Sequence, residues 1–193
     1  MANKPTEQYT IRAKVFDIVP QFFILDEQGQ TIGYCRQKLF KFKEELIVYT
    51  DRSKEKELLR IKARNIIDFA ATYDVKLPDG SAIGSLRRKG LKSTFMRDEY
   101  LVFDAASNQV ATLQEDSTWR ALLRRGIDYA AMLMPQKFIL RDTAGQEVAI
   151  FRQHFNPFVL RIGIAVLKDD EVLDDLMLIA TGVLAAAIEG RQR

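Results

Sequence analysis

Two short segments of the chain concentrate basic side chains that could bind anions. Four bases fall within eight positions of the first segment and four within six positions of the second: Arg36, Lys38, Lys41 and Lys43, then Arg87, Arg88, Lys89 and Lys92. Arginine binds a phosphate as a bidentate donor, and lysine binds it as a point charge. Facing the same way, these residues would form a site for anionic lipid headgroups, to which each base contributes about 1 kcal/mol near a membrane surface. A third group follows at Arg120, Arg124 and Arg125.

The same bases have a second interpretation that assigns them no ligand. Charged residues on the outward positions of strands keep a β protein soluble and block unwanted strand pairing. Glu44, Glu45 and Glu57 lie close enough in the sequence to be their partners. Exposed ion pairs of this kind contribute little to stability. The sequence alone leaves both interpretations open.

An acidic segment, KDDEVLDD, precedes the last apolar stretch of the chain. It contains the carboxylates Asp169, Asp170, Glu171, Asp174 and Asp175. They lack the alternating ligands and central glycine of an EF-hand. Carboxylates at the start of a helix cap its free N–H groups and complement its dipole. We therefore expect helix capping here and no metal site.

The chain has a single histidine, His154, and a single cysteine, Cys35. One of each is too few for most zinc sites and for a disulfide framework. We expect His154, at a strand end next to the turn-forming Asn156-Pro157, to be structural, and Cys35 to be a small buried hydrophobe. The sequence has no glycine-rich phosphate loop and no nucleophile elbow. These observations favour a protein that is not an enzyme and uses no cofactor.

The composition is that of an ordinary globular protein, with 47% hydrophobic and 28% charged residues. The net charge is +3, from 29 basic and 26 acidic residues, which is too balanced to indicate a nucleic-acid partner. The first ten residues, MANKPTEQYT, contain no apolar stretch of the kind found in secretory signals. We expect a cytoplasmic protein. A further expectation is that it attaches peripherally to a membrane surface.

Four segments read as β-hairpins with a turn led by Asp. Asp26 with Gly29, and Asp142 with Gly145, have the spacing of a type I turn followed by a left-handed residue, and Pro78-Asp79-Gly80 forms a similar turn. In the fourth, from Asp104 to Asn108, we expect the asparagine to take the positive φ. Aligned on the turn glycine, the returning strands carry small residues at Gly33, Gly84 and Ala149 and arginines at Arg36, Arg87 and Arg152. The small residues indicate that another element packs closely there.

Further strands are expected at residues 45–51, 57–63, 68–75 and 157–166, with residues 10–19 as another strand or a short helical lead-in. The count comes to about a dozen strands. Residues 117–135 have helical spacing and end at Pro135, which predicts one short surface helix. We expect Trp119 and Tyr129 to pack this helix against the rest of the protein, with a position at a lipid interface as the alternative.

The stretch LMLIATGVLAAAI, Leu176 to Ile188, has no charged side chain. A helix of this length spans roughly 20 Å, against about 30 Å for the hydrocarbon core of a bilayer. A short helix that is apolar on all sides must be surrounded by protein. We therefore predict a mainly β protein: a closed antiparallel barrel of about twelve strands around a buried C-terminal helix. In domain terms, residues 1–9 are a tail and residues 10–193 one barrel domain, with the core helix at about 171–189.

The chain resembles the tubby C-terminal-like superfamily, which includes LURP-one-related proteins and phospholipid scramblases. The resemblance rests on the following segments in this order: FKFKEELIVYTD, LLRIKARNIIDFAATYDV, DGSAIGSLRRK, FNPF and the acidic lead into a terminal apolar helix. It implies a twelve-stranded barrel threaded by its C-terminal helix. It also implies phosphoinositide binding, as in tubby proteins, calcium-dependent lipid mixing, as in scramblases, or a defence role, as in plant relatives.

We expect from these features a binding module for anionic phospholipid headgroups. The first alternative is a scaffold that binds proteins not yet identified and has no lipid role. The second is scramblase-like activity, which would require the segment from Leu176 to Ile188 to leave the barrel.

Overall fold

The computed structural model describes residues 5–14, 19–36, 45–64, 71–89, 99–116, 136–154, 156, 158–170 and 173–189. Within these ranges lie twelve strands and one helix, α3. The strands are β1 (Tyr9–Lys14), β2 (Gln21–Leu25), β3 (Thr31–Arg36), β4 (Glu45–Tyr49), β5 (Glu57–Ala63), β6 (Thr72–Lys76), β7 (Ala82–Arg88), β8 (Glu99–Asp104), β9 (Gln109–Glu115), β10 (Lys137–Asp142), β11 (Glu147–His154) and β12 (Val159–Val166). The helix α3 is Asp175–Glu189. The predicted helix at 117–135, with Trp119 and Tyr129, lies outside the described residues.

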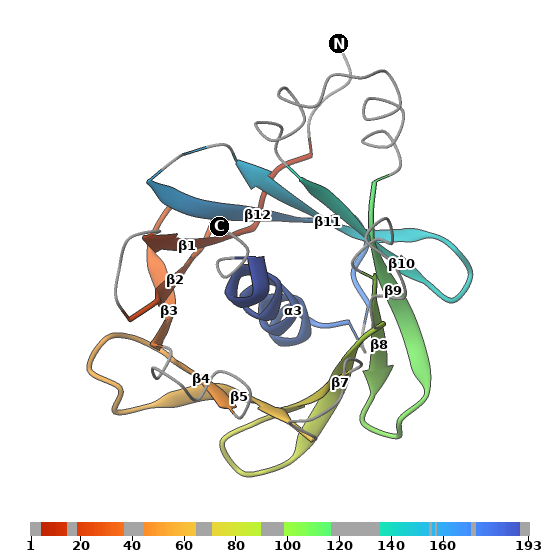
Figure 1. Ribbon diagram of the computed structural model, residues 1–193, viewed down its shortest axis with the longest axis horizontal. Helices are drawn as coiled ribbons and strands as arrows, with labels where there is room; N and C mark the ends of the chain where they lie inside the picture. Colours follow the sequence, from red (N-terminus) through yellow and green to blue (C-terminus); the bar gives the residue numbers. More distant parts are fainter. Residues whose placement is uncertain are drawn as a thin grey trace.

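The strands form a closed antiparallel barrel, as the sequence predicts (Figure 1). Each strand pairs with its neighbours in the chain, and β1 closes the ring by pairing with β12 as well as with β2. Ile11 is the residue at the seam: it lies opposite Ile162 on one side and Ile24 on the other. Closure leaves no unpaired sheet edge in this ring.

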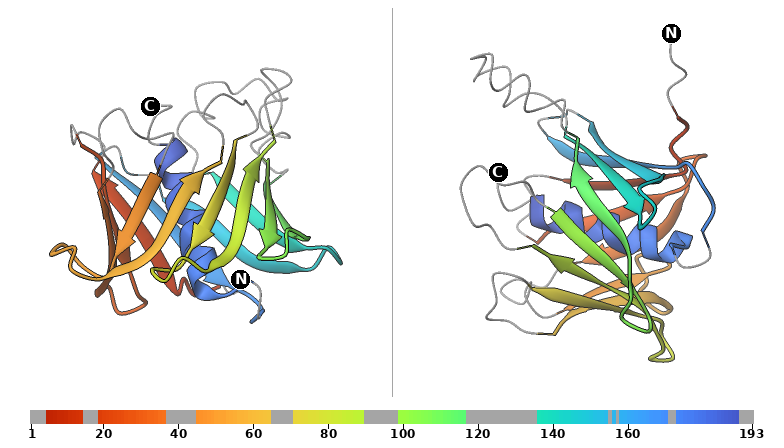
Figure 2. Two further views of the ribbon diagram at one scale, coloured as in Figure 1. Left: turned by 90° about the horizontal axis from the view of Figure 1, so that it is seen from below. Right: turned by 90° about the vertical axis from the view of Figure 1, so that its right-hand side faces the viewer.

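The two ends of the barrel differ. The even-numbered strands finish at what we call the turn end, where short turns join β2 to β3, β4 to β5, β6 to β7, β8 to β9 and β10 to β11. The odd-numbered strands finish at the opposite end, which we call the loop end because longer connections follow β3, β7 and β9. The helix enters at the turn end and runs toward the loop end (Figure 2).

The turns follow the predicted chemistry with one exception. Gly29, Gly80 and Gly145 have φ values of 78°, 89° and 80°, as the glycine positions predict. In the fourth turn the positive φ belongs to Ser107, at 68°, and the expectation for Asn108 is wrong. Ser107 is the residue whose N–H donates to the Asp104 carbonyl, while Asn108 donates both its backbone N–H and its side-chain amide to the Asp104 carboxylate. The left-handed position is therefore three residues after the Asp, as it is in Gly29 and Gly145.

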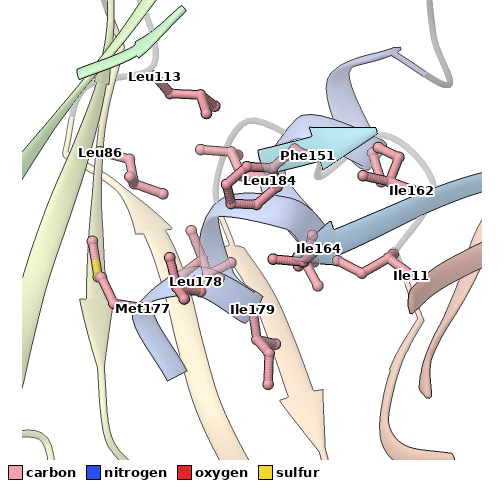
Figure 3. Packing of buried hydrophobic residues seen from close by; sticks show 14 of the residues in the cluster. Ile11, Leu86, Leu113, Phe151, Ile162, Ile164, Met177, Leu178, Ile179 and Leu184 are labelled. Atoms are coloured by element: carbon pink, nitrogen blue, oxygen red, sulfur yellow. The ribbon is translucent and has the colours of Figure 1, made fainter. Parts of the chain in front are cut away.

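The helix α3 forms the centre of the core (Figures 1 and 3). Its side chains from Met177 to Ala187 are buried, and the inward residues of the strands surround them. Gly182 permits this close packing: a Cβ there would lie 2.6 Å from the Ile11 Cδ1 and 2.8 Å from the Ile164 Cδ1. The buried Thr181 hydroxyl donates to the Met177 carbonyl at 2.8 Å, which satisfies it within the helix. The apolar C-terminal segment is the core of the barrel, and not a surface element.

Candidate functional site

Four of the eight predicted anion-binding residues lie in the described part of the chain, and all four are at the loop end. Arg36 is the last residue of β3, Arg87 and Arg88 finish β7, and Lys89 follows directly. They do not form one cluster, since β4, β5 and β6 separate β3 from β7 in the ring. The other four, Lys38, Lys41, Lys43 and Lys92, lie outside the described residues, as do Arg120, Arg124 and Arg125.

The four described bases have different surroundings. Arg36 and Arg87 are exposed and lie on the outward side of their strands. Arg87 donates through Nε to Thr72 Oγ1 at 3.2 Å, and its guanidinium lies 5.0 Å from the centre of the Phe103 ring. Lys89 forms an ion pair with Glu99, with 2.8 Å between Nζ and Oε1, and Arg88 is half-buried. Arg36 and Arg87 are therefore the more accessible members.

The barrel places a third outward arginine in line with these two. Arg152 of β11 occupies the position that Arg36 has in β3 and Arg87 has in β7, seven residues after the turn glycine. In the ring of twelve strands, β3, β7 and β11 follow one another at intervals of four. The three arginines are thus spread evenly around the outside of the barrel toward its loop end.

The acidic partners suggested by the sequence serve a different base. Glu45 and Glu57 both bind Arg60 of β5, at 3.0 and 2.8 Å. Arg64 pairs with Asp74 at 2.6 Å, and hydrogen bonding to that carboxylate raises the pKa of Arg64. Arg60 and Arg64 are therefore neutralised by ion pairs within β4, β5 and β6, and Glu44 lies outside the described residues.

Barrel closure also assembles a basic area that sequence reasoning missed. Arg12 of β1 lies directly opposite Arg161 of β12, and Arg161 lies opposite His154 of β11 on its other side. Both arginines are exposed, and neither side chain has a hydrogen bond or an ion pair to the described residues. Residues 12 and 161 become neighbours only because the first strand pairs with the last. No local pattern in the sequence could have indicated this.

His154 is engaged by the segment before β1. Its Nε2 lies 2.9 Å and 3.0 Å from the two carboxylate oxygens of Glu7. Gln8, the next residue, accepts the Val166 N–H through Oε1 at 2.7 Å. The prediction of a structural role for His154 agrees with this contact, which fastens the start of the chain to β11 and β12.

The acidic segment before α3 caps the helix, as predicted. Asp174 Oδ1 accepts the Met177 N–H at 2.8 Å, and Asp170 Oδ1 accepts the Leu173 N–H at 3.1 Å. Asp175 accepts a hydrogen bond from the Tyr9 hydroxyl; burial and this bond raise the pKa of Tyr9 to about 12. Among the described residues, no three His, Cys, Asp or Glu side chains are grouped so that they could hold a metal ion.

Cys35 is completely buried among the inward residues of the barrel, as predicted. Burial raises the pKa of its thiol to about 12, so that it is protonated at neutral pH. A protonated, inaccessible thiol is neither a nucleophile nor a metal ligand. Its role in the described structure is packing.

The fold defines the class of protein: a closed twelve-stranded antiparallel barrel wrapped around one C-terminal helix. A solved structure shares it, that of the Arabidopsis thaliana protein AT5G01750. The likeness has a TM-score of 0.50 and 12% sequence identity, and covers 97% of this chain and 94% of the plant protein. Identity this low supports a common fold and nothing finer. No protein-family model and no curated protein matches the chain.

In the described part of the chain, no helix has both the length and the apolar character needed to cross a bilayer.

Proposed function

We propose that this protein is a non-enzymatic module that binds anionic phospholipid headgroups at the cytoplasmic surface of a membrane. We also propose that it belongs to the tubby C-terminal-like superfamily, together with LURP-one-related proteins and scramblases. The barrel threaded by a terminal helix supports this membership, as do the segments DGSAIGSLRRK and FNPF in the expected order.

The observation that carries the proposal is the placement of Arg36 and Arg87 at one end of the barrel. Both are exposed, both point outward, and both lie where an odd-numbered strand finishes. Arg152 continues the series on β11. Because the three strands are spread around the ring, they can approach one flat surface together only if the barrel stands with its loop end toward that surface. We therefore expect end-on docking.

The energetics fit a reversible attachment. A base near an anionic membrane surface contributes about 1 kcal/mol, and the contribution falls off within a Debye length of roughly 10 Å. A few such residues hold a protein weakly and in a salt-dependent manner. The ion pair of Lys89 with Glu99 reduces what that lysine can add. The binding should accordingly depend mainly on Arg36 and Arg87.

The test is flotation of the full chain with vesicles of phosphatidylcholine containing increasing phosphatidylserine. Binding should rise with the anionic lipid and fall with added salt. The variant Arg36→Glu with Arg87→Glu should reduce the apparent affinity about tenfold or more, since each reversal replaces attraction by repulsion. The matched control is Lys54→Glu with Lys56→Glu, the same charge change on exposed residues at the turn end.

The control should bind as the wild type does if docking occurs through the loop end. Equal losses in the two variants would mean that net charge alone governs binding, and end-on docking would be wrong. Absence of flotation at low salt would rule out the lipid proposal and favour the scaffold alternative.

A further inference from the structure

On the outer face of β12, the missing side chain of Gly163 leaves a space that the Glu7 carboxylate fills; we call this space the hollow. Its neighbours Ile162 and Ile164 are buried in the core, so position 163 faces outward, between them in the alternation of the strand. A Cβ at this position would collide with the carboxylate of Glu7, which occupies the space that a side chain would fill. Glycine inside a strand often marks a place where another group approaches the backbone closely. Here that group is a carboxylate.

Cationic side chains surround the hollow. Arg152 of β11 lies directly opposite Gly163, and Arg161 lies two residues before it on the same face. Arg161 in turn lies between Arg12 on β1 and His154 on β11. Like charges placed opposite each other on adjacent strands repel, and an anion between them removes the repulsion. The Glu7 carboxylate fills the Cβ position of Gly163 and contacts His154, on strands that also carry Arg152 and Arg161.

The present occupant is a short piece of the protein's own chain. Glu7 supplies the carboxylate to His154, and Gln8 accepts the Val166 N–H. The contact is accessible to water, since the side chains of His154 and Glu7 are 30% and 21% exposed. A ligand in solution can therefore reach this contact and compete with Glu7 for it.

We propose that the hollow at Gly163 is a recognition site for an acidic side chain on an extended segment of a partner protein, with Glu7 as the built-in occupant that the partner displaces. The chemistry follows from what the site already holds: a carboxylate over a glycine, on strands that carry arginines, next to a glutamine that accepts the Val166 N–H. This function goes beyond the lipid proposal: the two share Arg152, but the peptide site lies on β11 and β12, away from Arg87 on β7.

The test uses the full chain and two synthetic peptides. One is acetyl-ANKPTEQ-amide, which reproduces residues 2–8, and the other has glutamine in place of its glutamate. Binding is followed by the backbone amide NMR signals of Gly163, Arg161 and Val166 in the wild type and in Glu7→Ala. The acidic peptide should shift these signals in Glu7→Ala with an affinity about tenfold higher than in the wild type, where the tethered Glu7 competes.

The glutamine peptide should cause no comparable shift, and Arg161→Glu in the Glu7→Ala background should abolish the response. Arg161 is exposed, so this variant should keep the dispersed spectrum of the folded barrel. Equal affinities in the wild type and in Glu7→Ala, or equal shifts from the two peptides, would overturn the proposal. Inorganic phosphate and phosphatidylserine vesicles are tested as alternative ligands. If either shifts the same NMR signals while the acidic peptide does not, the site binds that anion and the peptide proposal is wrong.

Discussion

Gly84 of β7 lies directly against Met177 of α3. A Cβ at position 84 would be 3.1 Å from both Sδ and Cε of the methionine, and 2.5 Å from the carbonyl oxygen of Phe103 on the neighbouring strand. The glycine thus permits the first turn of the helix to approach the barrel wall. It is also one of the small residues that the aligned hairpins singled out.

Gly84→Ala should lower the free energy of unfolding by about 1–3 kcal/mol, the usual cost of overpacking a core. The carbonyl of Phe103 cannot move without disturbing the sheet, so relaxation is limited. Urea denaturation followed by circular dichroism measures the effect. Ala82→Ser, at the exposed start of the same strand, is the control and should change little. A variant as stable as the wild type would mean that α3 is not seated against β7.

Asp174→Ala should destabilise the protein by about 1 kcal/mol, because it removes the acceptor for the Met177 N–H at the start of α3. Asp174→Asn keeps an acceptor and should recover most of the loss. The matched control is Asp169→Ala, an exposed carboxylate in the same segment. Equal effects at positions 174 and 169 in thermal unfolding would argue for general electrostatics and against capping.

Leu184→Ala should cost about 2–5 kcal/mol, as expected when a fully buried leucine is truncated. Leu184 is 1% exposed and lies among strand residues on the inside of the barrel (Figure 3). Leu167, by comparison, is 41% exposed, and Leu167→Ala should be nearly neutral. Guanidinium denaturation of the two variants compares the loss of unfolding free energy at a core leucine with that at a surface leucine. Similar losses of unfolding free energy would contradict the burial of α3.

The protein should lose stability at alkaline pH partly through Cys35. Its pKa is raised to about 12 in the folded state, above the value in an unfolded chain, so the neutral thiol favours folding. That contribution is complete below the unfolded pKa and declines as the pH rises toward the folded one. Between about pH 8 and about pH 10.5 the loss should reach about 2 kcal/mol. The pH dependence of unfolding should be shallower in Cys35→Ala by this amount, and identical slopes would show that the thiol is solvated.

Much of the fold could be predicted because its signals are local. The turns at Gly29, Gly80 and Gly145 are specified by a few neighbouring residues, and the apolar helix is specified by its own composition and length. In the fourth turn, residue preference favours a positive φ at Asn108, because asparagine tolerates this conformation better than serine does. The structure has the positive φ at Ser107, because the third position after the Asp takes this conformation whichever residue stands there. Local hydrogen bonds from Ser107 and Asn108 to Asp104 override residue preference at this turn.

The candidate sites were less predictable because they depend on closure of the barrel. Arg36 and Arg87 were recognisable as clustered bases, but their common end of the barrel follows only from the strand order. Arg12 and Arg161 meet across the seam between the first and last strands, and Glu7 meets His154 from 147 positions away. Nothing within either local segment specifies such a contact.

The proposed membrane binding uses the outer surface of a barrel that stays closed around α3. Hydrogen exchange of the backbone amides of residues 178–187, with and without phosphatidylserine vesicles, tests whether the barrel stays closed. We expect these amides to remain strongly protected in bound protein, while protection increases near Arg36 and Arg87. Loss of protection in α3 on vesicle binding would mean that the helix leaves the barrel, and would favour membrane insertion over surface docking.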